Sequence, residues 1–192
     1  MLFAASCILF IATGAHAQSL GAMMRETGFD RLIGTWGDQE SNGERIKVTF
    51  AWRLKEHAVG VSAKMGERHS EALIGIDPRS GDVLHVGVDD NGGAISGKWS
   101  EEEGNAVLEI EMIQSDGEER AAKIVHKFVS ADEIKVSMTN ADNGEEASMT
   151  LVRLKPEKNA KADTESVGEK PAPPSPPSAP SAPGGLRVIE VN

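Results

Sequence analysis

The feature that most constrains this chain is the regular recurrence of turn signals along residues 34–155. Asn-Gly and Asp-Gly pairs favour the positive φ angles that tight hairpin turns require. From residue 78 onward these signals recur about every 12 to 15 residues, which is typical of short strands joined by hairpins. They fall at Asn42-Gly43, Asp77–Gly81, Asn91-Gly92, Gly104-Asn105, Asp116-Gly117, Ala131-Asp132 and Asn143-Gly144.

Between the turns, apolar and polar residues alternate. In residues 45–54, Ile46, Val48 and Phe50 share one face of the segment, while Lys47 and Thr49 share the other. A period of two with one polar face indicates antiparallel strands that are buried on one side only. We expect about ten strands, over residues 34–40, 44–54, 57–65, 69–77, 82–89, 93–101, 105–114, 118–129, 132–140 and 145–155, preceded by a short helix or two within residues 19–33.

These strands are expected to form a single all-β domain over residues 18–155. Because every connection is short, successive strands should pair as a meander. An open meander of this length would leave two unpaired edges and a large exposed apolar face, and closure removes both. The predicted fold is therefore an antiparallel up-and-down β-barrel of about 8–10 strands, wide enough to hold a small ligand or to be filled with side chains.

Residues 1–17 predict a secretory signal peptide. They carry no charged side chain, their apolar run is too short to cross a bilayer as a helix, and Ala15-His16-Ala17 resembles a cleavage site. We expect cleavage before Gln18 and a periplasmic or extracellular protein without a transmembrane segment in the mature chain; the alternative is a buried N-terminal helix. The only cysteine, Cys7, lies in this segment, so the mature chain would contain neither thiol nor disulfide.

Residues 156–192 differ in composition from the rest of the chain. Residues 171–183 hold seven of the nine prolines, and such a run lacks the apolar surface needed to join a core. We expect a disordered tail rich in Pro, Ala and Ser. Its last residues, 186–192 (LRVIEVN), could add a strand to the edge of a sheet or bind an envelope partner; a frayed end is the simpler expectation.

Charge and motifs exclude several functions. Thirty acidic and 20 basic side chains give a formal net charge of -10, which repels nucleic-acid phosphates. The chain has no Gly-x-Ser-x-Gly, no His-Glu-x-x-His and no phosphate-binding loop. A non-enzymatic protein is therefore expected, and an enzyme is the third hypothesis, which the missing motifs weaken without closing it. Residues 89–93 (DDNGG) contain part of a calcium loop but lack its distal Glu, and a hairpin turn is expected there instead of a metal site.

Short motifs at both ends of the predicted barrel resemble those of a known protein superfamily. Gly34-Thr35-Trp36 opens the first strand and Arg153 lies in the last one. This pattern resembles the calycin superfamily (lipocalins, fatty-acid-binding proteins, avidins), in which a basic residue of the final strand packs over the tryptophan. The resemblance implies that Trp36 and Arg153 close one end of the barrel. The layout is also similar to exported bacterial lipocalin-like proteins of unknown function, through residues 49–52 (TFAW) and 74–81 (IGIDPRSG).

A set of apolar and histidine side chains is predicted to line the lumen of this barrel. Methionine is flexible and suits adaptable apolar cavities, so these side chains either line a ligand cavity or fill the interior. The set comprises Trp52, His57, Val61, Met65, Trp99, Met112, His126, Met138 and Met149. His57 and His126 are also placed to bind haem or a metal, although hydrogen-bonded core histidines are the simpler expectation. His69 and His85 are expected outward or near turns.

The function expected from the sequence is the non-enzymatic binding of a small apolar or amphipathic ligand in the lumen of an exported barrel. No cofactor is expected, with haem as the alternative. The second expectation is a structural or interaction module of the cell envelope with a filled barrel, in which the Pro-rich tail tethers or presents a partner-binding segment. Neither function involves nucleic acid.

Overall fold

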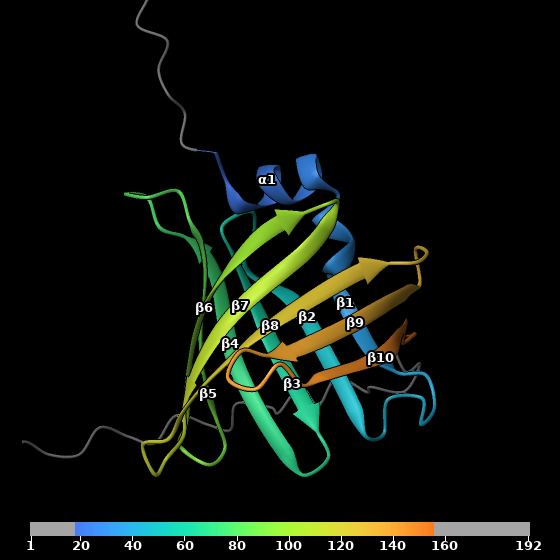
Figure 1. The fold of residues 1–192 in the computed structure, drawn as a ribbon. Helices are drawn as coiled ribbons and strands as arrows, with labels where there is room; N and C mark the ends of the chain where they lie inside the picture. Colours follow the sequence, from blue (N-terminus) through green and yellow to red (C-terminus); the bar gives the residue numbers. More distant parts are fainter. Residues whose placement is uncertain (1–17, 156–192) are drawn as a thin grey trace, which may run out of the picture. The chain divides into compact units, whose positions relative to one another are not determined.

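The computed structural model describes residues 18–155, so the predicted signal peptide and the Pro-rich tail lie outside the described residues. Within this range, two short helices precede ten strands that form a closed antiparallel barrel (Figure 1). Each strand pairs with the next along the chain and β10 pairs with β1, which confirms the predicted meander barrel and its short N-terminal helix. The elements are α1 (Leu20–Thr27), η1 (Phe29–Leu32), β1 (Gly34–Asp38), β2 (Ile46–Leu54), β3 (Ala58–Met65), β4 (Arg68–Ile76), β5 (Val83–Asp89), β6 (Ala94–Glu102), β7 (Asn105–Ile113), β8 (Glu119–Phe128), β9 (Glu133–Asn140) and β10 (Glu146–Arg153).

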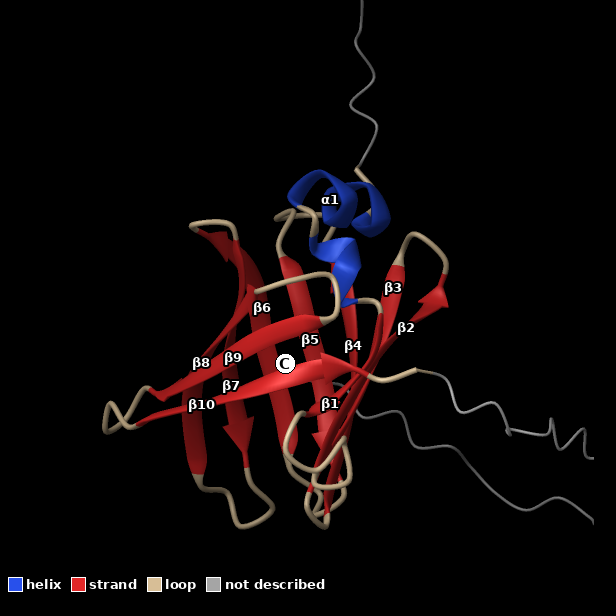
Figure 2. Ribbon diagram, turned by 90° about the vertical axis from the view of Figure 1, so that its right-hand side faces the viewer, coloured by secondary structure: helices blue, strands red, loops and turns tan. Residues whose placement is uncertain are grey.

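The two ends of the barrel differ. Helix α1 lies across one end, which we call the helix end, and hairpin turns surround the opposite, far end (Figure 2). Inward-facing side chains near the helix end are fully buried, with Trp36 and Val59 both 0% exposed. At inward positions toward the far end, Met65 is 54% and Met138 is 40% exposed. The core is therefore concentrated under α1, and the far end is open to solvent.

The first and last strands are joined at the helix end by Trp36 and Arg153. These residues face each other in the β1–β10 register, and the guanidinium carbon lies 4.2 Å from the centre of the indole ring. Trp36 Nε1 donates to the Leu32 carbonyl at 2.8 Å, and Arg153 donates to the carbonyls of Ile33 (2.9 Å) and Arg31 (2.7 Å). Trp36 and Arg153 thus link the first and last strands of the meander to η1. This is the end of the barrel that the resemblance to calycins implies they close.

Strand β1 ends earlier than expected because the side chain of Asp38 organises the following turn. Its carboxylate accepts from the Ser41 hydroxyl at 2.6 Å, from the backbone N–H of Ile46 at 2.9 Å and from Arg45 at 3.2 Å. These bonds, the one from Ser41 first, hold the pKa of the Asp38 carboxyl well below its usual range. The chain therefore leaves the sheet at Asp38 and re-enters it at Ile46.

Candidate functional site

The site is built from α1 and the lumen-facing side chains below it. Ser19 caps the helix by accepting from the N–H of Ala22 at 3.2 Å, and Gly28 ends it with a φ of 73°. The apolar residues of α1 fall three and four positions apart, so Leu20 and Met24 point together into the barrel and are buried. An eight-residue helix is marginal on its own, and this buried face keeps it folded.

Polar contacts fix α1 to the turn between β2 and β3. The Gly21 N–H donates to the Glu56 carbonyl at 3.1 Å, and Arg25 donates two bonds, of 3.0 and 2.8 Å, to the Glu56 carboxylate. The ion pair is solvent-exposed, so it orients the helix more than it stabilises the fold. The position of α1 over the lumen is thus determined by one face of the helix and one hairpin turn.

An apolar cavity of about 150 Å³ lies between these helices and the lumen. A cavity of this size in an apolar protein interior can hold a benzene-sized molecule. The helices contribute Leu20, Met23, Met24, Thr27, Phe29 and Leu32 to its wall. The barrel contributes Phe50, Ile74, Val83 and Trp99, with Ser100 and Glu101 beside them.

Trp99 is the centre of a cluster of rings in the lumen. Its ring centroid lies 6.4 Å from that of Phe50 in an edge-to-face arrangement, 6.2 Å from His85 and 5.2 Å from His126. Such aromatic contacts fix ring orientations as well as burying area. The indole therefore has a defined position on the cavity wall.

Two polar atoms of this cluster, Trp99 Nε1 and His85 Nδ1, are buried and have no hydrogen-bond partner among the described residues. By contrast, His126 Nδ1 lies 3.3 Å from the Ala106 carbonyl oxygen. Leaving a buried donor or acceptor unpaired costs about 1–3 kcal/mol, so native proteins seldom retain one without a role. Both side chains point inward from β5 and β6, and of the two only Trp99 lies on the wall of the cavity under α1.

Both buried histidines are neutral at physiological pH. Burial lowers the pKa of His85 to about 4. Burial also lowers the pKa of His126 to about 4, although its bond to Ala106 acts in the opposite direction. A neutral imidazole has one nitrogen that donates and one that accepts a hydrogen bond. Each of these imidazoles therefore carries one donor and one acceptor nitrogen inside the barrel.

The structure distributes the predicted lumen residues along the whole length of the barrel. Trp99 lies on the cavity wall, and His126 touches it. Val61 is buried at an inward position of β3, while Trp52 and Met149 pack partly buried against the core. Met112 packs beside Ile110 in β7, and Met65 and Met138 lie toward the open far end.

Two of the histidine predictions are wrong. His57 lies in the turn between β2 and β3 and is exposed, because β3 begins only at Ala58; it cannot share a lumen site with His126. His85, expected outward or near a turn, faces the lumen from the middle of β5 and is only 7% exposed. The helix residues Leu20, Met23 and Met24 were also missed as cavity residues. Their spacing indicated a helix but not its placement over the barrel end.

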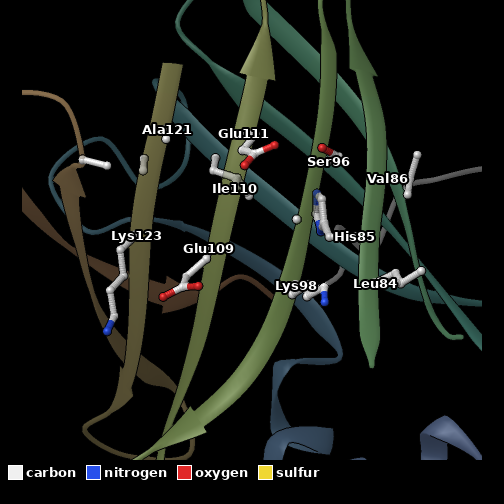
Figure 3. A pocket seen from close by; sticks show the side chains of 13 residues that line it. Leu84, His85, Val86, Ser96, Lys98, Glu109, Ile110, Glu111, Ala121 and Lys123 are labelled. Carbon is white, nitrogen blue, oxygen red and sulfur yellow. The ribbon is translucent and has the colours of Figure 1, made fainter. Parts of the chain in front are cut away.

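A second hollow, of about 690 Å³, lies on the outer face of β5–β8 (Figure 3). Gly97 of β6 is among the residues that line it, and a Cβ at this position would overlap the Glu109 carbonyl oxygen and the Ile110 side chain. Its surface is mixed, with Leu84 and Val86 on one side and Lys98, Glu109 and Lys123 across the neighbouring strands. This outer groove is open to solvent, and more of its lining side chains are charged than in the cavity under α1.

Residues 18–155 contain no group of three or more His, Cys, Asp or Glu side chains arranged to hold a metal ion. In the same range, no helix is both long and apolar enough to cross a membrane.

The fold and the site together define a class: a closed ten-stranded antiparallel barrel, capped at one end by a helix, with an apolar cavity below the cap. No protein-family model and no curated protein matches the chain.

Proposed function

We propose that this protein is a non-enzymatic container that holds a small apolar or amphipathic molecule in the cavity under α1. The cavity itself carries the proposal. Its wall is formed mostly by apolar side chains from the two helices and from strands β2, β4, β5 and β6, and its volume of about 150 Å³ suits one ring or a short chain. Small-molecule sites of proteins share this character, with a mostly apolar wall and a few polar groups.

The test uses two valines of β5 that differ only in the side of the sheet they face. Val83 lines the cavity, whereas Val86 is 59% exposed on the outer face. We expect toluene to bind the wild type and Val86→Phe equally, and Val83→Phe at least about tenfold more weakly, because the larger ring occupies the cavity. Ligand-observed NMR titration gives the Kd, and urea unfolding checks that both variants are folded. Equal binding to all three proteins would contradict the proposal.

Native mass spectrometry of the protein purified from its own host complements this test. A co-purifying small molecule that is retained by Val86→Phe and lost from Val83→Phe would identify the resident ligand.

A second candidate function, an interaction module, is favoured by apolar side chains on the outer face. Leu73 and Val86 stand opposite each other on β4 and β5 and are 54% and 59% exposed. Exposed apolar groups that adjoin one another are typical of contact surfaces. If this surface carries the function, Leu73→Asp with Val86→Asp should abolish the phenotype that the wild-type gene restores in a deletion strain, and Val83→Phe should not. The container function predicts the reverse.

We also propose that the protein acts after export, in the periplasm or outside the cell, on the basis of the signal-like pattern in residues 1–17. Mass spectrometry of the chain recovered from the envelope fraction should show Gln18 as its first residue.

A further inference from the structure

We propose that the ligand held under α1 is a small organic cation, and that the Glu101 carboxylate at the rim of the cavity binds its ammonium group. This inference rests on the proposed function, since it names the chemical class of the molecule held at the same site. It follows from the charge of the cavity wall, because among the described residues that form this wall Glu101 alone carries a charged side chain.

Glu101 lies on the lumen side of β6, close to the end of the strand that α1 covers. Side chains two residues apart on a strand point to the same face, and Trp99, two residues before Glu101, lies on the cavity wall. Ala106, which stands opposite Glu101 in the β6–β7 register, is 0% exposed. The turn that joins β6 to β7 lies next to α1 (Figure 1). A carboxylate thus occupies an inward position of the barrel, where it is exposed to water at the rim of an apolar cavity.

The Glu101 carboxylate has spare capacity for a ligand. Its Oε1 accepts from the Gly104 N–H at 2.9 Å, whereas a carboxylate has two oxygens and about four acceptor sites. The neighbouring Glu102 instead binds Lys123 Nζ at 2.8 Å through both of its oxygens. No basic side chain within residues 18–155 forms an ion pair with Glu101. An ammonium group can therefore approach Glu101 without displacing a cation of the protein.

The wall beside Glu101 suits a cation that has an apolar body. The rings of Phe29, Phe50 and Trp99 line the cavity, and the face of an aromatic ring attracts a cation. Residues two apart on a strand are separated by about 6.6 Å, so a ligand can pack its hydrocarbon part against Trp99 while its ammonium group reaches Glu101. An anionic group in the same place would be repelled by the carboxylate. The expected ligand class is therefore a single ring or short hydrocarbon that carries an ammonium group.

Benzylamine and phenylacetate provide a matched pair of probes. Each is toluene with one charged group on its methyl carbon, an ammonium in the first and a carboxylate in the second. Exposed ion pairs are individually weak, but this comparison adds the attraction of the cation to the repulsion of the anion. We expect the wild type to bind benzylamine at least about tenfold more tightly than phenylacetate in ligand-observed NMR titrations at neutral pH and low ionic strength.

Three variants test the assignment to Glu101. Glu101→Gln removes the charge but keeps an oxygen that can accept from the Gly104 N–H, and it should reduce the preference for benzylamine at least about threefold. Glu101→Lys should reverse the preference. Glu111→Gln is the matched control, because it changes the net charge by the same amount as Glu101→Gln but lies in the outer groove; it should keep the preference. Toluene should bind all four proteins equally, and urea unfolding checks that each variant is folded.

The outcomes separate this inference from the proposed function. If toluene binds but the wild type does not prefer benzylamine to phenylacetate, the selection of cations is wrong and the container function stands. If Glu101→Gln and Glu111→Gln lower the preference equally, or if neither lowers it, the preference comes from the net charge of the whole protein and the assignment to Glu101 is wrong. If none of the three probes binds, the container function fails and the selection of cations fails with it.

Discussion

Replacing Trp36 with alanine should lower the free energy of unfolding by about 3–5 kcal/mol, the usual cost of removing a large buried aromatic side chain. The indole is 0% exposed, and its Nε1 satisfies the Leu32 carbonyl at 2.8 Å. The substitution leaves a void beneath Arg153 and removes the surface on which the guanidinium packs. Urea unfolding followed by far-ultraviolet circular dichroism measures the loss.

The matched control is Trp52→Ala, because Trp52 is an indole on the neighbouring strand that is only half-buried. It should lose clearly less stability than Trp36→Ala, since less apolar area returns to water. If the two variants lose the same stability, or if Trp36→Ala unfolds like the wild type, then Trp36 and Arg153 do not hold the barrel closed.

Acid should destabilise the protein through His85 and His126, by about 2 kcal/mol for each and about 4–5 kcal/mol for the pair at pH 4.5 relative to pH 7. Burial lowers the pKa of each histidine to about 4, whereas an unfolded histidine takes up its proton near pH 6.5. Below pH 6.5 the unfolded state therefore binds more protons than the folded state. Stability is complete above this pH and is lost progressively as the pH falls toward about 4.

Urea unfolding at half-unit intervals from pH 7 to pH 4.5 measures this slope. His85→Gln with His126→Gln should flatten it, because glutamine does not titrate. His57→Gln should leave it unchanged, because His57 is exposed in a turn. A slope that persists in the double variant would show that other groups cause the acid sensitivity.

The strands were predictable because each carries its own signal. Turn pairs such as Asn91-Gly92 mark the ends, and alternation such as that of Ile46, Val48 and Phe50 marks the interior, so all ten strands fall within a few residues of their expected positions. The remaining differences in strand bounds arise where a side chain forms hydrogen bonds that the alternating pattern does not indicate. At the end of β1, for example, the Asp38 carboxylate accepts from the Ser41 hydroxyl and from the Ile46 N–H.

The candidate site was predictable only in part, and β5 shows the reason. Its apolar residues Leu84, Val86 and Val88 alternate with His85, so hydrophobicity alone favours an outward histidine. The register with β4 and β6 instead places His85 in the lumen and leaves Val86 59% exposed. Because side chains alternate strictly along a strand, the pairing of neighbours decides the face for every residue at once.

The sequence by itself determined the all-β class, the approximate number of strands and their meander order, because hairpin turns and period-two alternation are local properties of the chain. Only the tertiary structure decided which strand faces form the lumen, where α1 covers it, and that Trp99 and His85 meet there without hydrogen-bond partners. These features depend on the strand registers of a closed barrel. Closure brings together residues from different strands, and their spacing along the sequence does not indicate that they make contact.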